Sequence, residues 1–447
     1  MPDQSYSVDV EKNASTEKKQ TAASTQDVQD ETHTQPTIVF PEGGWQAWST
    51  VAGVWIMQFA TFGYTNAYGV YNDFYVREYL SPKYSSSQIS WIGSVQLLLV
   101  MSMGLVTGRA FDTGYFYPMI LTGTLLYAFC LFMLSLTQPE QYYQVFLSQG
   151  LGLGIAIGIT YLPGLCVVSH YFHRRRALAL GIASSGSAVG GVVHPIMLNK
   201  LFYGGVGFHQ GVRASAALNV GLLAIACLMM RTRLPPKPNR NTSLLRDFLT
   251  FSRDAPYVIT VFGTMLVICG IYYPIFFLQL NAIKNGISPS LAFYTLAILN
   301  GTSVVGRVLP NFLVHRFGVY TVVIPCVVVC AVLNFCTLGI HTAAGTLLFA
   351  VLFGFFSGAY IGLFAPMIAS LARNDAEMGS RMGICFTFTG IGGLLGTPIS
   401  GALLTSRFLW WRPIVFAGMC ITCGCLCFIT TLVLLSRQAR ERRKLAS

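Results

Sequence analysis

Charged side chains are scarce in this chain of 447 residues. Only 10% of the residues are Asp, Glu, Lys or Arg, whereas 53% are hydrophobic. Soluble domains carry about one quarter charged residues, so this composition excludes an ordinary soluble protein. The mean hydropathy of +0.57 points the same way. We therefore predict a protein that crosses a membrane many times.

Motifs that carry enzyme chemistry are also missing. The chain has no GxxxxGKS or GxxxxGKT phosphate loop, no HExxH metal motif and no GxSxG nucleophile turn. Without them, ATP-driven pumping, zinc catalysis and serine hydrolysis have no recognisable machinery. We expect no enzyme activity, no catalytic residues, no cofactor and no bound metal.

Cysteines are present but do not form a disulfide framework. All twelve fall inside apolar runs, where cysteine packs as a small apolar residue. Cys420 and Cys423 have the CxxC spacing, but cysteines on mixed faces of a helix do not supply a set of metal ligands. We predict neither a disulfide nor a metal site.

Positive charge is unevenly distributed along the chain. The net charge is +12, although residues 1–40 contain seven acids and only three lysines. The remaining basic residues lie mainly in alternate loops, a pattern typical of the cytosolic side of a membrane protein. No basic stripe alternates with stacking aromatic residues, so we predict no nucleic-acid partner. We expect both termini in the cytosol and the protein in the plasma membrane.

Twelve apolar runs are long enough to cross a bilayer as helices, which takes about 20 residues each. The basic, proline-rich stretch from Arg231 to Arg240 separates the first six runs from the last six, and neither a helix nor a core tolerates such a stretch. The predicted helices span approximately residues 47–72, 88–109, 117–137, 141–168, 176–198, 213–231, 255–280, 290–313, 319–340, 344–371, 381–405 and 411–436.

The predicted organisation has five parts and a weak internal repeat. Three glycines of the fifth run recur at a constant spacing in the eleventh, namely Gly181, Gly190 and Gly191 as Gly383, Gly392 and Gly393. Such parallel repeats are typical of transporters. The five parts are a disordered acidic cytosolic tail (1–40), a first six-helix bundle (41–231), a basic proline-rich cytosolic linker (232–254), a second six-helix bundle (255–436) and a basic cytosolic tail (437–447).

Three stretches of the sequence are specific enough to indicate a family. They are Pro41–Trp48 (PEGGWQAW), Gly108–Phe116 (GRAFDTGYF) and Tyr171–Gly181 (YFHRRRALALG). Together they resemble the monocarboxylate-porter family of the major facilitator superfamily, in its fungal branch, over residues 41–436. The resemblance implies an all-α fold of twelve transmembrane helices in two six-helix pseudo-repeats, which transports by alternating access. For the arginines of the third stretch, we favour membrane topology over a substrate-binding or catalytic role.

Asp112 is the charged centre of the second stretch. The resemblance implies that Asp112, with Gly108 and Gly114, forms an inner gate. Its carboxylate would meet either a cation such as Arg381 or the positive amino end of a neighbouring helix. The second half has His315 where an aspartate is usual, so we expect a one-sided gate. A solvated turn carboxylate is the alternative.

Arg307 is a charge inside a predicted span, where charge is costly unless it faces a cavity or a partner. Carriers of the family are similar in having an arginine on span eight, so the resemblance implies that Arg307 binds a substrate carboxylate. Those carriers pair this arginine with an aspartate and have a lysine on span one, where this chain has Ser303 and Val70. Proton-coupled monocarboxylate uptake is therefore in doubt. A purely structural pairing of Arg307 is the alternative.

The spans contain further candidates for a substrate pocket. His194 is the main buried titratable group and a candidate proton relay, with a structural histidine as the alternative. The others, unless they only pack between helices, favour a larger, partly aromatic or amphipathic substrate over a lactate-sized anion. They are Gln58, Asn66, Tyr68, Tyr272, Tyr273, Asn300 and Tyr360.

These features together predict a transporter of a small organic metabolite, acidic or amphipathic, that works by alternating access. Its expected partners are the substrate and the lipid bilayer, and no oligomer is required. Efflux of a fungal secondary metabolite fits this prediction. Uptake of a monocarboxylate or vitamin-like nutrient is one alternative, and a nontransporting nutrient sensor is another.

Overall fold

The computed structural model describes residues 40–80, 83–234, 244–372, 377–404 and 409–446. Residues 41–447 form one compact unit. The predicted acidic tail therefore lies outside the described residues apart from Phe40, and so do residues 235–243 of the predicted linker.

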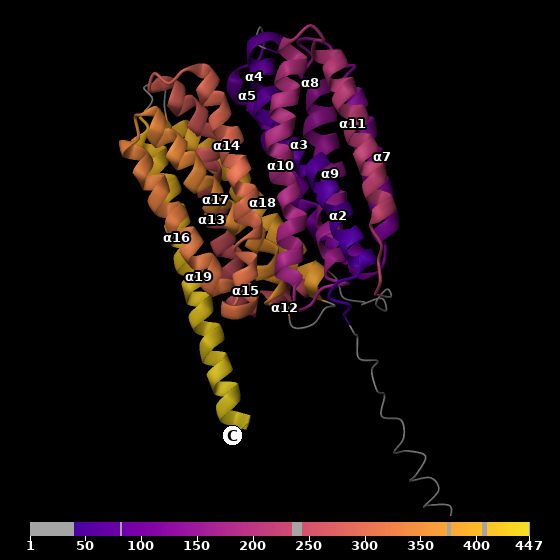
Figure 1. The fold of residues 1–447 in the computed structure, drawn as a ribbon, viewed down its shortest axis with the longest axis vertical. Coiled ribbons are helices and arrows are strands. Elements are labelled where there is room, and N and C mark those ends of the chain that lie inside the picture. Colours follow the sequence, from indigo (N-terminus) through magenta and orange to yellow (C-terminus); the bar gives the residue numbers. More distant parts are fainter. Residues whose placement is uncertain (1–39, 81–82, 235–243, 373–376, 405–408, 447) are drawn as a thin grey trace, which may run out of the picture. The chain divides into compact units, whose positions relative to one another are not determined.

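Every regular element in the described ranges is a helix, as predicted (Figure 1). Eleven helical stretches are long and apolar enough to cross a membrane, and they match eleven of the twelve predicted ranges. The multi-pass, all-helical fold is confirmed. The first half contains α2 (Trp45–Ala60), α3 (Phe62–Asn66), α4 (Tyr68–Phe74), η1 (Tyr75–Tyr79), α5 (Ser86–Ser102), α6 (Gly104–Asp112), α7 (Phe116–Leu134), α8 (Tyr142–Val145), η2 (Phe146–Leu153), α9 (Gly154–Val168), α10 (Arg176–Tyr203) and α11 (Phe208–Met229).

The second half repeats this pattern of long helices joined by short turns. It contains α12 (Leu244–Phe251), α13 (Ala255–Lys284), α14 (Pro289–Val308), α15 (Asn311–Phe317), α16 (Val319–Cys336), η3 (Thr337–Gly339), α17 (Ala343–Ala369), α18 (Met378–Leu404) and α19 (Trp411–Ala446).

The first predicted span, 47–72, differs because it is not one continuous helix. It is divided into α2, α3, α4 and the π-helical turn η1, with breaks at Thr61 and Ala67. The Thr61 hydroxyl donates a hydrogen bond to the Met57 carbonyl at 2.6 Å. Such a bond back to the preceding turn bends helices. Hydropathy therefore predicts this crossing but not its interruption.

The second part of the predicted linker forms a helix, α12. Asp247 of this helix is buried and lies 4.0 Å from Arg109 of α6. The Phe248 ring stacks on Phe388 of α18 with centroids 6.5 Å apart. Contacts with both halves therefore hold α12 in place, and a prediction from linker composition does not include them.

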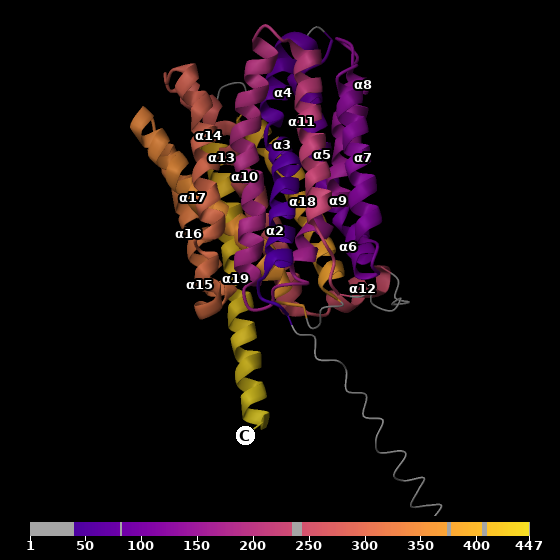
Figure 2. The same cartoon turned by 45° about the vertical axis from the view of Figure 1, so that its right-hand side comes forward.

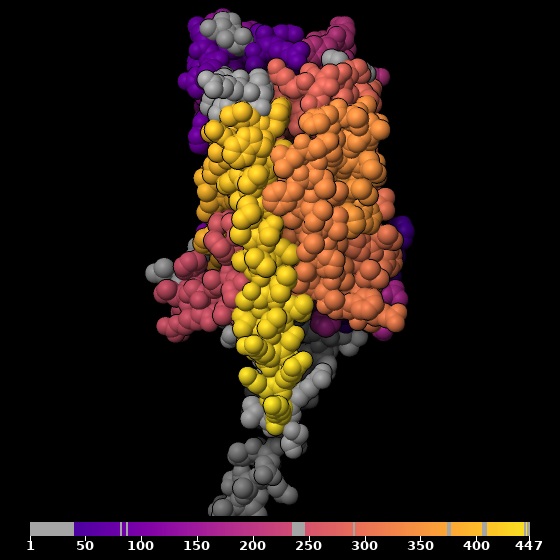
Figure 3. All heavy atoms as spheres, turned by 90° about the vertical axis from the view of Figure 1, so that its left-hand side faces the viewer, coloured from indigo at the N-terminus to yellow at the C-terminus, as the bar shows by residue number. Residues whose placement is uncertain are grey.

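The last helix is longer than predicted. α19 continues from Trp411 to Ala446, well beyond residue 436. Figure 3 shows this helix passing along its neighbours and extending past them. Residues 437–446 of the predicted basic tail thus prolong the last membrane helix.

The two halves meet along two sets of helices. α10 of the first half packs on α14 and α15, and the two views in Figures 1 and 2 show α10 beside α14. α5 and α6 of the first half pack on α18. We call the end of the bundle that carries α12, α15 and the α9–α10 loop the linker end. The candidate site lies between these two contact zones.

Candidate functional site

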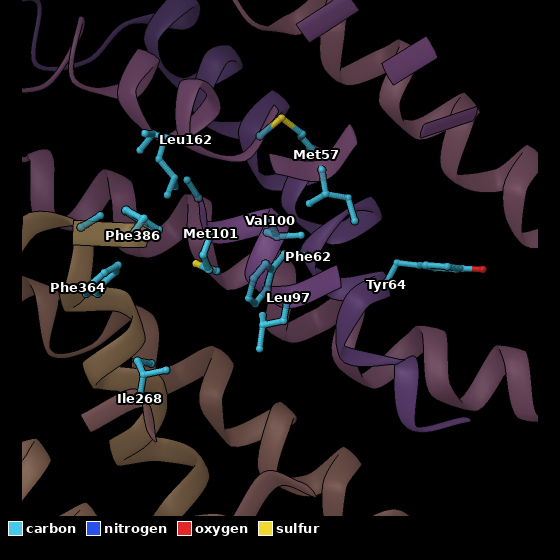
Figure 4. Close-up of a cluster of buried hydrophobic side chains, with 14 of the residues drawn as sticks. Met57, Phe62, Tyr64, Leu97, Val100, Met101, Leu162, Ile268, Phe364 and Phe386 are labelled. Atoms are coloured by element: carbon cyan, nitrogen blue, oxygen red, sulfur yellow. The ribbon is translucent and has the colours of Figure 1, made fainter. Parts of the chain in front are cut away.

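An aromatic cavity of about 40 Å³ lies between the two halves. Figure 4 shows Phe62, Leu97 and Met101 of the first half converging with side chains of the second half. No charged residue of the described part lines it. The full lining is Phe62, Leu97, Met101, Tyr161, Ile268, Tyr272, Tyr360, Ile361, Phe364, Phe386, Thr389, Gly390 and Gly393.

The size of this aromatic cavity indicates a contracted state. One water molecule needs roughly 10–15 Å³ of such space, so the cavity holds a few waters at most. Ligand pockets usually measure roughly 300–1,000 Å³. A metabolite therefore fits only after the surrounding helices move apart.

Two of the predicted pocket residues, Tyr272 and Tyr360, line this cavity. Tyr360 is fully buried, and its hydroxyl has no hydrogen-bond partner among the described residues. A buried unpaired hydroxyl is unfavourable, so a ligand that accepts its hydrogen bond is favoured here. Tyr161 of α9 also lines the cavity, and sequence reasoning missed it. A single tyrosine in an apolar run has no signal that separates it from a packing residue.

Two other predicted pocket tyrosines do not line the aromatic cavity. Tyr273 packs against α19, because consecutive residues of a helix point about 100° apart and Tyr272 takes the cavity side. The Tyr68 hydroxyl donates a hydrogen bond to the Ile89 carbonyl of α5 at 2.9 Å. Both side chains have partners within one half of the molecule in this state.

Arg307 lies on α14 with only 3% of its surface exposed. Its Nη1 donates to the Ser184 carbonyl at 2.8 Å and to the Ser187 hydroxyl at 2.5 Å, both on α10 of the other half. Its Nε donates to the Ser303 hydroxyl at 3.3 Å. No carboxylate in the described ranges pairs with it. Arg307 therefore ties α14 to α10 and carries its charge without a counter-ion.

The two predicted asparagines lie on the same side of α10 as Arg307. Asn66 Nδ2 donates to the Ser187 carbonyl at 3.4 Å. A Cβ atom on Gly191 would lie 3.1 Å from Asn300 Oδ1 and 3.3 Å from Asn66 Nδ2. We call Asn66, Ser187, Asn300 and Arg307 the polar column. It places hydrogen-bonding groups from both halves between α10 and α14.

His194, the candidate proton relay, is fully buried. Its Nε2 lies 3.1 Å from the Phe59 carbonyl and donates to it, while Nδ1 has no partner in the part of the chain described. Its ring packs against Phe59 and Tyr64 with centroids 4.7 and 5.2 Å apart. A relay needs a proton partner at each nitrogen. These contacts favour the structural alternative.

The predicted gate lies where α6 and α18 touch backbone to backbone. A Cβ atom on Gly108 would collide with the Gly379 carbonyl, and Gly104 and Gly383 repeat this close approach one turn away. A Cβ atom on Gly379 would lie 2.7 Å from Oδ2 of Asp112. Gly379 belongs to the first turn of α18, where the helix dipole is positive. Of the two partners predicted for Asp112, the one that lies next to its carboxylate is therefore the amino end of a neighbouring helix, α18.

Arg381 is not the partner of Asp112, and this part of the prediction is corrected. Arg381 Nη1 pairs with Asp254 at 2.8 Å and Nε pairs with Glu377 at 3.2 Å. Its guanidinium also lies over two aromatic rings. Two carboxylates of its own half thus occupy Arg381, and a sequence alone does not show which acid is nearest.

Gly114 shapes the turn that follows the gate. It has a φ of +94°, in the left-handed region that favours glycine. Its N–H donates to the Phe111 carbonyl at 2.9 Å and so closes the end of α6. Gly114 therefore allows the chain to turn at the end of α6, which is a structural role.

Glu42, in the stretch before the first helix, binds the basic α9–α10 loop. Its carboxylate accepts the backbone N–H groups of His173, Arg174 and Arg175 at 2.8, 2.5 and 3.0 Å, and its own N–H donates to the Tyr171 carbonyl at 3.1 Å. Partial burial alone would raise the pKa of Glu42, but these donors hold it below the ordinary value of a glutamate. The sequence signal was the stretch Pro41–Trp48 itself, which we interpreted only as part of the family resemblance.

Two six-helix halves that meet around an aromatic cavity and a buried arginine define a membrane transporter of the alternating-access type. The chain belongs to the Major Facilitator Superfamily, whose family model matches residues 51–309 and 260–447.

Relatives of this chain include fungal efflux proteins. The aspyridones efflux protein apdF of Emericella nidulans is 36% identical over 406 residues, which cover 91% of this chain and 82% of that protein. The agnestins efflux protein AgnL12 of Paecilomyces divaricatus is 35% identical over 358 residues, 79% of this chain and 80% of that one. These similarities support the family assignment.

Solved structures show the same fold. The E. coli fucose:proton symporter FucP superposes with a TM-score of 0.67 at 16% identity, over 86% of this chain and 99% of its own. An outward-facing bacterial homologue of the iron transporter ferroportin superposes with a TM-score of 0.68 at 12% identity, over 87% of this chain and 100% of its own. At such low identity the likeness concerns the fold alone.

Proposed function

We propose that this transporter exports an amphipathic fungal secondary metabolite with an aromatic or conjugated body and an acidic group. The observation that carries the proposal is the aromatic cavity, which six aromatic side chains line without any charged residue. Aromatic faces favour flat conjugated molecules through stacking. The two efflux proteins described above support the outward direction.

Arg307 is the proposed anchor for the acidic group. It is a buried cation at the contact between the halves, where it bonds α10 from α14. In the contracted state its partners are a carbonyl and two hydroxyls. A carboxylate is a stronger acceptor than any of these. An acidic substrate therefore competes with α10 for Arg307, and its binding loosens the contact between the halves.

The remaining site assignments are part of the same proposal. Asn66 and Asn300 would contact the polar end of the substrate, and Tyr272 and Tyr360 its conjugated body. Tyr68 would join the pocket only after helices rearrange, whereas Tyr273 and His194 are assigned structural packing roles within their own halves. Gating is assigned to Gly108 and Asp112, whereas Gly114 shapes the adjoining turn and Arg381 forms ion pairs within its own half.

We further propose the placement of the chain in the cell and in its superfamily. The three family stretches support the monocarboxylate-porter branch, without the Asp and Lys that Ser303 and Val70 replace. The distribution of basic residues supports cytosolic termini and the plasma membrane. The rocking units would be residues 41–231 and 255–436, joined by the linker 232–254.

A direct test compares the metabolites of cells with and without the gene, inside and outside the cell. Export predicts that one or more conjugated acids accumulate inside the deleted strain and are depleted from its medium. Purified protein in lipid vesicles should then transport the same compound. Depletion inside the deleted strain would instead support uptake. Vesicles that move none of these compounds, while a ligand still triggers signalling in cells, would support the sensor.

A further inference from the structure

A second, basic cavity opens at the linker end, away from the aromatic cavity. Its volume is about 720 Å³. The α9–α10 loop and the start of α10 form one wall, and α15, α16 and the end of α17 form the other. We call it the basic groove. Because α10 and α15 belong to different halves, the groove lies at a joint of the transporter (Figure 1).

The basic groove carries a concentrated positive charge. The charge comes from Arg174, Arg175 and Arg176, which line the groove together with His173 and His315, and no Asp or Glu of the described residues lines it. The nearby carboxylate of Glu42 accepts backbone N–H groups of the loop, and no ion pair in the described ranges joins it to a guanidinium there.

Two contacts show that this groove is more than a solvated basic loop. Arg174 Nε donates a hydrogen bond to His315 Nε2 at 2.8 Å, which connects the two halves across the groove. Asn311 in the groove wall is 2% exposed; its Nδ2 donates to the Arg307 carbonyl at 2.7 Å, while its Oδ1 has no partner among the residues described. The groove therefore offers guanidinium donors and one buried acceptor.

We propose that the basic groove binds a ligand that has both a phosphate group and a hydroxyl. The ligand is either the headgroup of an anionic lipid or a free phosphate compound. Guanidinium groups bind phosphate oxygens in bidentate fashion, and the start of α10 adds N-terminal helix charge. The hydroxyl would donate to the unpaired Oδ1 of Asn311. Topology requires only that arginines lie on one side of the membrane, and does not require them to share a groove with the other half.

A bound phosphate would also affect the transport cycle. It would contact Arg174 of one half and His315 of the other, and so add a bridge that requires these two residues to be as close as they are here. We call this arrangement the closed linker end. A ligand that binds one state better shifts the equilibrium toward that state. The ligand would therefore stabilise the closed linker end.

The test uses full-length protein in nanodiscs of zwitterionic lipid, with two kinds of addition. One arm adds a few per cent of a phosphatidylinositol phosphate to the lipid, and the other adds inorganic phosphate or inositol phosphate to the buffer. Binding is measured by native mass spectrometry and by the shift in unfolding temperature. The variant Arg174→Gln/Arg175→Gln is compared with Arg437→Gln/Arg440→Gln, which removes the same charge from the exposed end of α19.

Wild type and the α19 variant should bind the same phosphate probe equally well, and the groove variant should bind it more weakly by about tenfold or more, since it loses two guanidinium partners of the phosphate. Binding only in the lipid arm assigns a headgroup, and binding only in the buffer arm assigns a free phosphate compound. Equal weakening in both variants, or no binding in either arm, would overturn the proposal. Because export is assayed separately, failure here leaves the proposed transport function unaffected.

Discussion

At the scale of single residues, the most informative side chain is Glu42. It lies outside the helices, yet its carboxylate accepts hydrogen bonds from three backbone N–H groups of a loop more than a hundred residues away in sequence. Such charge-assisted hydrogen bonds are among the strongest in proteins. The family signature therefore acts as a clamp between the start of the first helix and the α9–α10 loop.

Replacing Glu42 by Gln should lower thermal stability at neutral pH, by about 1 kcal/mol after allowance for solvent screening. The folded protein depresses the pKa of Glu42 below its ordinary value, so the stabilisation by the charged form is fully present above the pKa of the unfolded chain. The stabilisation is lost as the pH falls through the depressed pKa, and the two proteins should then converge. Unfolding temperatures in detergent between pH 3.5 and 7.5 measure this.

The exposed carboxylate of Glu78 provides the control for Glu42. Glu78→Gln should leave the unfolding temperature unchanged across the same pH range. If the unfolding temperatures of wild type and Glu42→Gln differ by the same amount at every pH, the charge of the carboxylate is not what stabilises the fold.

Tyr360→Phe should weaken substrate affinity about three- to tenfold, because it removes one hydrogen bond to the ligand. Stability should not fall, since the hydroxyl has no protein partner among the described residues. The matched control is Tyr273→Phe, which alters a buried tyrosine that packs against α19. Concentration-dependent transport in vesicles gives the affinities. Equal effects of both variants would remove Tyr360 from the substrate site.

At the scale of helices, the close contact of α6 with α18 depends on glycine. Gly108→Ala places a methyl group against the backbone of Gly379, which cannot move like a flexible side chain. Overpacking of this kind costs about 1–3 kcal/mol. We expect a lower unfolding temperature and slower transport, because the gate no longer closes fully.

Gly221→Ala on α11 is the matched control, because no atom lies within 4 Å of its Cβ position. It should retain wild-type stability and transport, or gain slightly from helix propensity. If Gly108→Ala behaves in the same way, the two helices do not need this contact for the transport cycle.

The helices themselves were largely predictable, because a membrane crossing requires a long apolar run and such runs are visible in composition. The break at Thr61 and the formation of α12 were not. The Thr61 bend rests on one side-chain bond, and α12 rests on contacts of Asp247 and Phe248 with both halves. Hydropathy contains neither kind of information.

At the scale of the whole molecule, Arg307 connects the two halves. Arg307→Gln removes a cation that bonds α10 in the contracted state and that we propose binds the substrate acid. Transport of an acidic substrate should fall about tenfold or more, since hydrogen bonds to charged groups contribute about 1.5–3 kcal/mol. Arg307→Lys keeps the charge without the planar fork and should retain part of the activity.

Vesicle transport of an acidic substrate and of its neutral ester separates the two roles of Arg307. A loss for both compounds would indicate a role in closing the halves, and a loss for the acid alone a role in binding. Full transport of the acid by Arg307→Gln would remove Arg307 from the substrate site.

The candidate site was predictable only in part. An arginine in an apolar span is conspicuous in any sequence, and Arg307 is indeed buried between the halves. Tyr272 and Tyr273 are indistinguishable in sequence, but only one of two consecutive helical residues faces the cavity. The pairing of Arg381 with Asp254 and Glu377, in place of Asp112, depends on which acids the folded chain brings nearest.

The sequence by itself determined the membrane location, the helical class, the two halves and the superfamily, because each follows from apolar length, glycine spacing and local motifs. Only the tertiary structure decided which residues meet: Glu42 with the basic loop, Asp112 with the start of α18, and Arg307 with α10. The physical reason is that hydropathy acts locally along the chain. Ion pairs, cavities and close backbone contacts form between helices that are distant in sequence.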